Sequence, residues 1–209
     1  MDRRITAVAS LLVGLLMLTA CGGVQNAPAG QAVPSAPAEV AARTPAAEPN
    51  PNATESNPPG DIPDSTVFVA YRTPRYQIKV PEGWARTTLA TGASFTDKLN
   101  SVRIETGPAT SAPTVTTATR AEVPKLKAAG GNFVLREIET VTRAGGQAVR
   151  IVYLVDSAPN PVTGKVVRDE AERYEFHRDG HEAILTLSGP VGADNVDPWK
   201  LVSDSFRWA

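Results

Sequence analysis

The fold is decided by the segment Tyr-Glu-Phe-His-Arg-Asp-Gly-His-Glu-Ala-Ile-Leu-Thr-Leu, residues 174–187. Its Asp-Gly pair suits a two-residue type I′ turn, in which both central residues need positive φ. On either side of this pair lie runs rich in apolar and β-branched residues, which are typical of strands. The pattern predicts a hairpin whose two strands cover residues 166–178 and 181–188.

The register of this hairpin follows from the position of the turn. Counting outward places Phe176 opposite Ala183 and Tyr174 opposite Leu185, all on one face. The second strand is apolar on both of its faces over residues 184–187. Such a strand is expected at the centre of a sheet, covered on both sides.

Further strands are predicted outward from the hairpin by the same periodicity. They cover residues 67–71, 76–80, 93–96, 101–106, 133–143 and 147–156. One helix is predicted from a capping-box sequence at Thr119 to the stop at Gly130-Gly131, and a second is predicted to begin at Asp194 or Asp197. Strands dominate and helices cover them, so the expected class is α+β with a mainly antiparallel sheet.

The N-terminus has the parts of a secretion signal. A basic start with Arg3 and Arg4 precedes an apolar run of about 15 residues, shorter than the roughly 20 that span a bilayer as a helix. The sequence Leu-Thr-Ala-Cys at residues 18–21 then matches the bacterial lipobox, in which a cysteine thiol is lipidated before cleavage ahead of it. We predict that residues 1–20 are a signal peptide and that Cys21 is the lipidation site.

The composition changes abruptly after Cys21. As far as residue 64 the chain is rich in Ala, Pro, Asn, Ser and Glu, and it cannot bury enough apolar surface to offset its ordering entropy. We therefore predict a lipidated, disordered tether over residues 21–64 and one globular domain over residues 65–209. The chain has 21 Lys and Arg against 22 Asp and Glu, a balance that gives no reason to expect a nucleic-acid partner.

Side chains suited to catalysis are sparse. The two histidines, His177 and His181, lie close to acidic residues and could in principle hold a metal or act as a general base, but the register points them to opposite faces of the hairpin. Cys21 is the only cysteine, and the nucleophile-elbow sequence Gly-x-Ser-x-Gly is missing. We predict no catalytic residue, no cofactor or metal ligand, and no enzyme activity.

Three segments together resemble the PsbP-like superfamily: residues 76–84 (Tyr-Gln-Ile-Lys-Val-Pro-Glu-Gly-Trp), the hairpin at 174–187, and the tail at 192–208. The resemblance extends over nearly all of residues 66–209. It implies an α/β/α sandwich in which helices cover both faces of a central, mainly antiparallel sheet. It also implies a role in binding or assembly, and it carries over no site residue.

The expected function follows from the anchor and the resemblance. We expect an extracytoplasmic lipoprotein that is held at the cell membrane by the lipid on Cys21 and acts as a non-enzymatic binding or assembly module of the cell envelope. Its expected partners are the membrane and an envelope protein or ligand that the sequence does not identify. The alternatives are a small hydrolase or metal-dependent enzyme that uses His177 or His181, and a solute-binding receptor for a transporter.

Overall fold

The computed structural model describes residues 59–209. The predicted signal peptide, Cys21 and the predicted tether as far as residue 58 lie outside the described residues. Among the described residues, no helix is long and apolar enough to cross a lipid bilayer.

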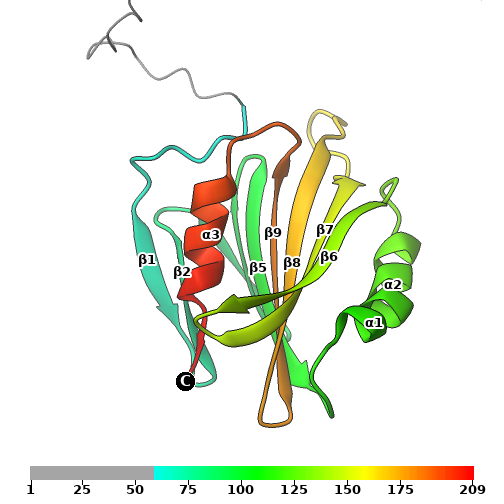
Figure 1. The fold of residues 1–209 in the computed structure, drawn as a ribbon. Coiled ribbons are helices and arrows are strands. Elements are labelled where there is room, and N and C mark those ends of the chain that lie inside the picture. Colours follow the sequence, from blue (N-terminus) through cyan, green and yellow to red (C-terminus); the bar gives the residue numbers. More distant parts are fainter. Residues whose placement is uncertain (1–58) are drawn as a thin grey trace, which may run out of the picture. The chain divides into compact units, whose positions relative to one another are not determined.

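A seven-stranded antiparallel sheet forms the centre of the domain (Figure 1). In spatial order its strands are β3 (Ala85–Leu89), β4 (Gly92–Asp97), β5 (Asn100–Pro108), β9 (His181–Pro190), β8 (Arg168–Arg178), β7 (Gly146–Asp156) and β6 (Val134–Arg143). The strand with apolar residues on both faces, β9, is the middle one, as predicted.

The hairpin of β8 and β9 has the predicted turn and register. Asp179 and Gly180 both have positive φ, 49° and 76°. Tyr174 pairs with Leu185, and Phe176 pairs with Ala183. The short-range pattern was sufficient here because a two-residue turn leaves only one pairing for the strands that it joins.

A second, three-stranded sheet contains β1 (Phe68–Arg72), β2 (Tyr76–Pro81) and β10 (Arg207–Trp208). The helix α3 (Val196–Ser205) runs alongside β2, and both pack over one face of the large sheet (Figure 1). Because β10 pairs with β2 only at Tyr76 and Gln77, the rest of that edge of β2 has no strand beside it. There the hydroxyl of Ser205 accepts a hydrogen bond from the backbone N–H of Lys79 at 2.8 Å, so the end of α3 covers the open edge.

The main core lies between the small sheet with α3 and the large sheet. It is rich in aromatic residues, and Phe206 contacts Phe176 with ring centroids 4.5 Å apart. Its largest fully buried side chains are Tyr174, Phe176, Phe206, Ile78, Ile104, Leu185 and Leu187. Aromatic side chains therefore form a large part of the main core.

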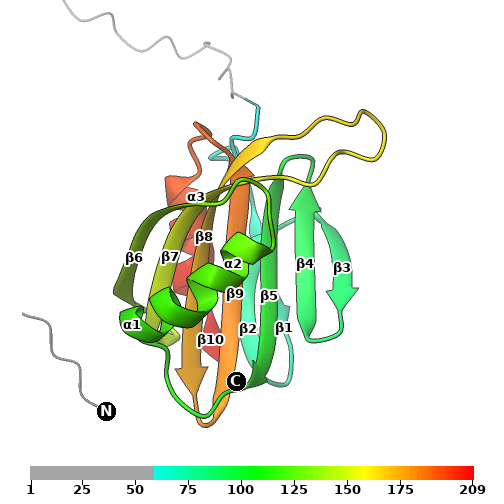
Figure 2. The ribbon, with the colours of Figure 1, turned by 90° about the vertical axis from the view of Figure 1, so that its right-hand side faces the viewer.

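The opposite face of the large sheet is covered by one helical segment, built from α1 (Val115–Thr117), the π-helical turn η1 (Ala118–Glu122) and α2 (Val123–Ala128). It lies across β6, β7 and β8, and the described residues leave β3 and β4 uncovered on this face (Figure 2). A smaller core beneath it contains Ala118, Val149, Ile151, Tyr153 and Ala171.

The start of this helical segment differs from the prediction. The capping box forms between Thr114 and Thr117, five residues before the predicted start at Thr119. The predicted start was wrong because the sequence Thr-Arg-Ala-Glu at residues 119–122, which resembles a capping box, lies inside the helical segment, in the π-helical turn. The segment ends as predicted, with Gly130 at a φ of 92°.

The predicted fold class needs correction. A mainly antiparallel sheet is confirmed, but the domain is mostly β, and helices do not form complete layers on both faces. One face is covered largely by the second sheet, whose strands β1 and β2 looked like members of a single sheet in the sequence. The edge strand β3 was missed because its residues, Ala-Arg-Thr-Thr-Leu, are mostly exposed and have no apolar alternation.

The packed chain includes residues that precede Ser65. The side chain of Ile62 is only 5% exposed and belongs to the main core. Asn195, the residue before α3, accepts a hydrogen bond from the backbone N–H of Ile62 at 2.8 Å and donates one to the carbonyl of Gly60 at 2.9 Å. These contacts attach residues 60–62 to the N-terminal end of α3.

Candidate functional site

A groove of about 450 Å³ lies between the outer face of the small sheet and the C-terminal end of α3. We call it the basic groove. Its charged lining residues are Arg72, Lys79, Arg207 and Asp204. The groove is open to solvent, so it offers a surface for binding.

The strand register places the cations of the basic groove together. Arg72 pairs with Gln77 across the β1–β2 ladder, and Gln77 pairs with Arg207 across the ladder to β10. Residues paired in this way point to the same face of a sheet. Tyr71 and Ile78, the next residues along β1 and β2, point to the other face, into the core. Burial of that apolar face therefore turns the charged face outward.

Two of the three cations are oriented by neutral acceptors. The guanidinium of Arg72 donates a hydrogen bond to Oε1 of Gln77 at 2.9 Å. The guanidinium of Arg207 donates to the carbonyls of Asp204 and Ser205, at 3.4 and 3.2 Å. Within residues 59–209, no carboxylate lies within ion-pair distance of Arg72, Lys79 or Arg207. Their positive charge is therefore available to an anionic partner.

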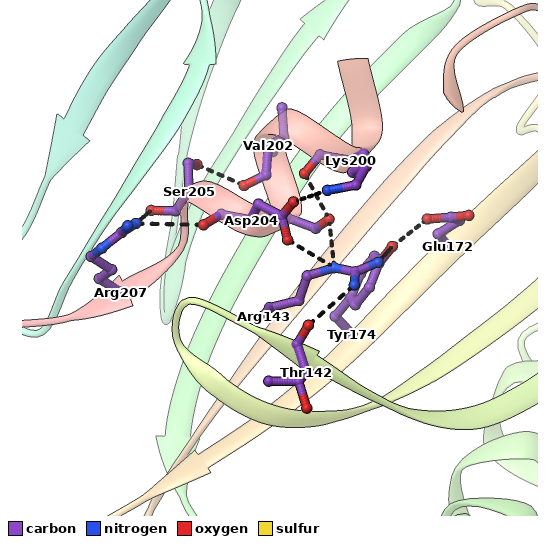
Figure 3. Close-up of polar contacts among 10 residues, drawn as sticks. Thr142, Arg143, Glu172, Tyr174, Lys200, Val202, Asp204, Ser205 and Arg207 are labelled. Carbon is purple, nitrogen blue, oxygen red and sulfur yellow. Dashed lines mark hydrogen bonds and ion pairs between the residues drawn. The ribbon is translucent and has the colours of Figure 1, made fainter. Parts of the chain in front are cut away.

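The acidic residue of the groove, Asp204, is already paired with other cations. One of its carboxylate oxygens lies 3.4 Å from Nε of Arg143, and the other contacts the ammonium of Lys200 (Figure 3). Arg143 also donates a hydrogen bond to the hydroxyl of Ser203 at 3.2 Å. These contacts hold the last turn of α3 against the end of β6 and leave the groove with a positive balance.

Arg143 is itself held by the large sheet. Its guanidinium lies 5.3 Å from the ring centroid of Tyr174, within the range of a cation–π contact. The hydroxyl of Tyr174 donates a hydrogen bond to Glu172 (Figure 3). Burial, and then the charge of Glu172, raise the pKa of the Tyr174 hydroxyl above its usual value, so this hydroxyl stays protonated at neutral pH.

A neighbouring ion-pair network is centred on Arg150. The guanidinium of Arg150 contacts Glu172 and lies 3.0 and 2.9 Å from the carboxylates of Glu137 and Glu139. Burial lowers the pKa of Arg150, but the hydrogen bond and charge of Glu172 and the hydrogen bond of Glu139 outweigh burial and raise it. The guanidinium of Arg150 thus links carboxylates from β6 and β8 to β7 and joins the three strands.

The two histidines do not come together. Nε2 of His177 lies 3.2 Å from the carbonyl of Ala109 on the face that α1, η1 and α2 partly cover. His181 lies on the other face, where Nδ1 donates to the carbonyl of Asp179 at 3.0 Å. The register had predicted this separation. Among the described residues, no three His, Cys, Asp or Glu side chains are placed to hold a metal ion.

The basic groove was missed in the sequence. Its cations come from residues 72, 79 and 207, and a single alternating strand does not reveal which residues of a distant strand will lie beside it. The available signal was the alternation of β2, in which Gln77 and Lys79 separate the buried residues Tyr76, Ile78 and Val80. Cys21, the predicted lipidation site, lies outside the described residues.

Comparison with solved structures shows which known fold this chain shares. The solution structure of cyanobacterial PsbP (CyanoP) from Synechocystis sp. PCC 6803 is 17% identical to this chain, covers 72% of it and 98% of its own length, and has a TM-score of 0.50. The chain has a PsbP-like fold. This confirms the resemblance seen in three sequence segments.

Two further solved structures with the PsbP-like fold are more distant. LpqN of Mycobacterium tuberculosis, described as involved in cell envelope biogenesis, is 12% identical, covers 70% of this chain and 86% of its own, and has a TM-score of 0.44. The Ran-binding protein Mog1p of Saccharomyces cerevisiae is 10% identical to this chain. The match covers 68% of this chain and 96% of Mog1p, with a TM-score of 0.46. The sequence matches no protein-family model and no curated protein.

Proposed function

We propose that this protein is an extracytoplasmic lipoprotein, anchored to the cell membrane through Cys21, which acts as a non-enzymatic binding or assembly module of the cell envelope. We further propose that the basic groove is its docking site. The partner is an envelope protein that presents an acidic segment, whose carboxylates pair with Arg72, Lys79 and Arg207.

The N-terminal sequence supports the anchored location. A basic start, a short apolar run and Leu-Thr-Ala-Cys at residues 18–21 occur in the order that export and lipidation require. An acidic, Pro-rich segment then separates Cys21 from the first packed residues. A domain attached in this way meets envelope proteins at high effective concentration, so a docking contact of modest affinity is sufficient.

The observation that carries the docking proposal is the lack of carboxylate partners for the groove cations in residues 59–209. Elsewhere in the domain, Arg143, Arg150 and Arg173 are each held in ion pairs. The groove brings three exposed cations without carboxylate partners together on one surface, whereas these three arginines are partly buried and paired. Electrostatic complementarity of this kind sets association rate and specificity more than affinity, and salt weakens it.

A photocrosslinking amino acid placed at Gln77, in the floor of the basic groove, tests the docking site in intact cells. The matched control position is Thr87, which is exposed on the edge strand β3. We expect a protein adduct from position 77 that is lost with Lys79→Glu and weakened by added salt. Equal adducts from both positions, or an adduct that Lys79→Glu leaves unchanged, would contradict the proposed site.

The anchor is tested separately by metabolic labelling with a fatty-acid analogue. We expect the label in the wild type and its loss in Cys21→Ser, because the thiol is the acyl acceptor. Continued labelling of Cys21→Ser would show that lipidation, if present, uses another residue.

A further inference from the structure

A second cavity lies at the opposite side of the large sheet from the basic groove. The loop between β7 and β8, residues 157–167, reaches over the turn between β4 and β5 at Lys98 and Leu99 (Figure 2). Together they enclose a pocket of about 360 Å³, which we call the loop pocket. Neither the proposed anchor nor the basic groove involves any of its residues.

The loop that forms this pocket is shaped by its own hydrogen bonds. The side-chain carbonyl of Asn160 accepts the backbone N–H groups of Val162 and Thr163, at 2.9 and 3.0 Å. At the base of the loop, the hydroxyl of Ser157 accepts the N–H of Val167 at 2.9 Å. The pocket is therefore preformed, and a ligand need not order the loop to enter.

The lining of the loop pocket combines apolar walls with one carboxylate. Leu99, Pro159, Pro161 and Val167 supply apolar surface. Asp169 lines the same pocket from the start of β8, and its Oδ1 atom is buried without a hydrogen-bond donor among the described residues. Oδ1 has almost no accessible surface, so a ligand in the pocket meets the carboxylate through its other oxygen. Within residues 59–209 this carboxylate forms no ion pair.

Two lysines complete the lining. Lys98 and Lys165 are exposed, and within residues 59–209 neither has a carboxylate within ion-pair distance. The loop pocket thus has a carboxylate without an ion-pair partner among the described residues, apolar walls and exposed positive charge.

We propose that the loop pocket binds a small aliphatic amine that carries an anionic group at its other end, that is, an ω-amino acid or a molecule of that class. Its ammonium group pairs with the carboxylate of Asp169. Its methylene chain packs against Leu99 and Val167, and its anionic end pairs with Lys98 and Lys165.

Charged groups around Asp169 make the interaction pH-dependent. Burial, and then the charge of Asp156, raise the pKa of Asp169 to about 6. Asp156 is paired with Arg168, and the lysines at 98 and 165 are the charged groups that the turn and the loop contribute to the pocket. Asp169 is therefore mainly ionised at neutral pH and accepts from an ammonium group, whereas below its pKa it is protonated and the attraction falls.

The experiment is a titration of the full chain in detergent with 5-aminopentanoate, n-butylamine and butyrate, followed through backbone amide NMR shifts of residues 98–99 and 157–169. We expect 5-aminopentanoate to bind most tightly and butyrate least. Binding should weaken about tenfold or more in Asp169→Asn, because a hydrogen bond to a charged group is lost, and it should be unchanged in the matched control Asp64→Asn.

Two further arms keep the test decisive if Asp169→Asn is poorly folded. Lys98→Ala together with Lys165→Ala should weaken 5-aminopentanoate but not n-butylamine. In the wild type, amine binding should weaken as the pH falls from about 7.5 to about 5. Butyrate binding as tightly as n-butylamine, or no shift with any probe at roughly 10 mM, would overturn the proposal.

Discussion

The two faces of the seven-stranded sheet are covered very differently. Along β9, the side chains of Ala183, Leu185 and Leu187 meet the small sheet and α3, and all three are 0% exposed. The alternate residues Ile184 and Thr186 point to the face of the short helical segment and are only partly buried. We call these the deep face and the shallow face.

The difference shows that the covering layer, more than the strand itself, determines burial. The same strand supplies both faces with apolar side chains, yet along β9 only the deep face is covered by the small sheet and α3. On the shallow face, ion pairs such as that of Arg173 with Glu175, 2.9 Å apart, occupy the positions that aromatic rings occupy on the deep face. We therefore expect the deep face to provide most of the stability.

The most direct test compares two neighbours on β9. Leu185→Ala should lower the free energy of unfolding by about 2–5 kcal/mol, because it leaves a cavity in the deep face. Ile184→Ala on the shallow face should cost only about 1 kcal/mol, because its side chain is partly exposed before the change. Urea denaturation measures both, and equal losses would show that the two faces are equally packed.

Residue Ile62 tests how far the deep face extends toward the N-terminus. Ile62→Ala should cost about 2–3 kcal/mol, because the side chain is 5% exposed in the main core. The control is Val67→Ala, which removes a side chain that is 58% exposed and should change stability by less than about 0.5 kcal/mol. Thermal unfolding of both variants would detect the difference. If Ile62→Ala leaves the unfolding temperature unchanged, residues 60–62 are not part of the cooperatively unfolding domain.

On the shallow face, the helical segment depends on its cap. Thr114→Ala removes the side chain that accepts the N–H of Thr117 at 3.1 Å, and it should cost about 1 kcal/mol. Thr110→Ala, in the exposed loop before it, should have almost no effect. Hydrogen exchange of amides 115–129 measures local opening, which we expect to increase in Thr114→Ala alone. Equal exchange in both variants would mean that packing alone holds the segment.

The carboxyl group of Asp169, also on the shallow face, should make stability depend on pH. Its pKa in the folded state is raised to about 6 by burial and Asp156, above the unfolded value of about 3.9. Below the lower value both states are protonated, and as the pH rises through this window the folded state is penalised for ionising. At neutral pH the free energy of unfolding of Asp169→Asn should therefore exceed that of the wild type by up to about 1 kcal/mol, after allowance for partial exposure. Parallel denaturation curves from pH 4 to 7.5 test this; a difference that does not grow with pH would contradict it.

The smallest effects are expected for the histidines, one on each face near the hairpin tip. His177→Ala and His181→Ala should each change stability by about 0.5 kcal/mol. Chemical denaturation of the wild type and both variants, with and without zinc, measures these changes in stability. A loss of several kcal/mol in either variant, or stabilisation of the wild type by zinc, would revive the metal-dependent alternative.

The sequence was most informative where contacts are local. The Asp179-Gly180 turn fixed the register of β8 and β9, and the central position of β9 followed from its two apolar faces. The division into two sheets was not predictable in the same way. The hairpin of β1 and β2 pairs with β10, more than a hundred residues away, and with no strand of the large sheet, and no local pattern shows this.

The candidate sites show the same limit. The histidines could be assigned to opposite faces because one hairpin contains both. The basic groove and the loop pocket are each assembled from segments far apart in the chain, such as Arg72 with Arg207 and Leu99 with Asp169. No motif marks such sites, because their geometry arises from tertiary packing.

The side chain of Asn195 has a mechanical consequence. Its amide links Gly60 and Ile62 to the start of α3, and it donates a further hydrogen bond to Oδ1 of Asn100, at the beginning of β5, at 3.1 Å. A pull on the chain from its N-terminus reaches the domain at these residues. The load is then divided among the entering segment, the helix and the central sheet, so the domain resists tension as a unit where an unlinked end would peel away residue by residue.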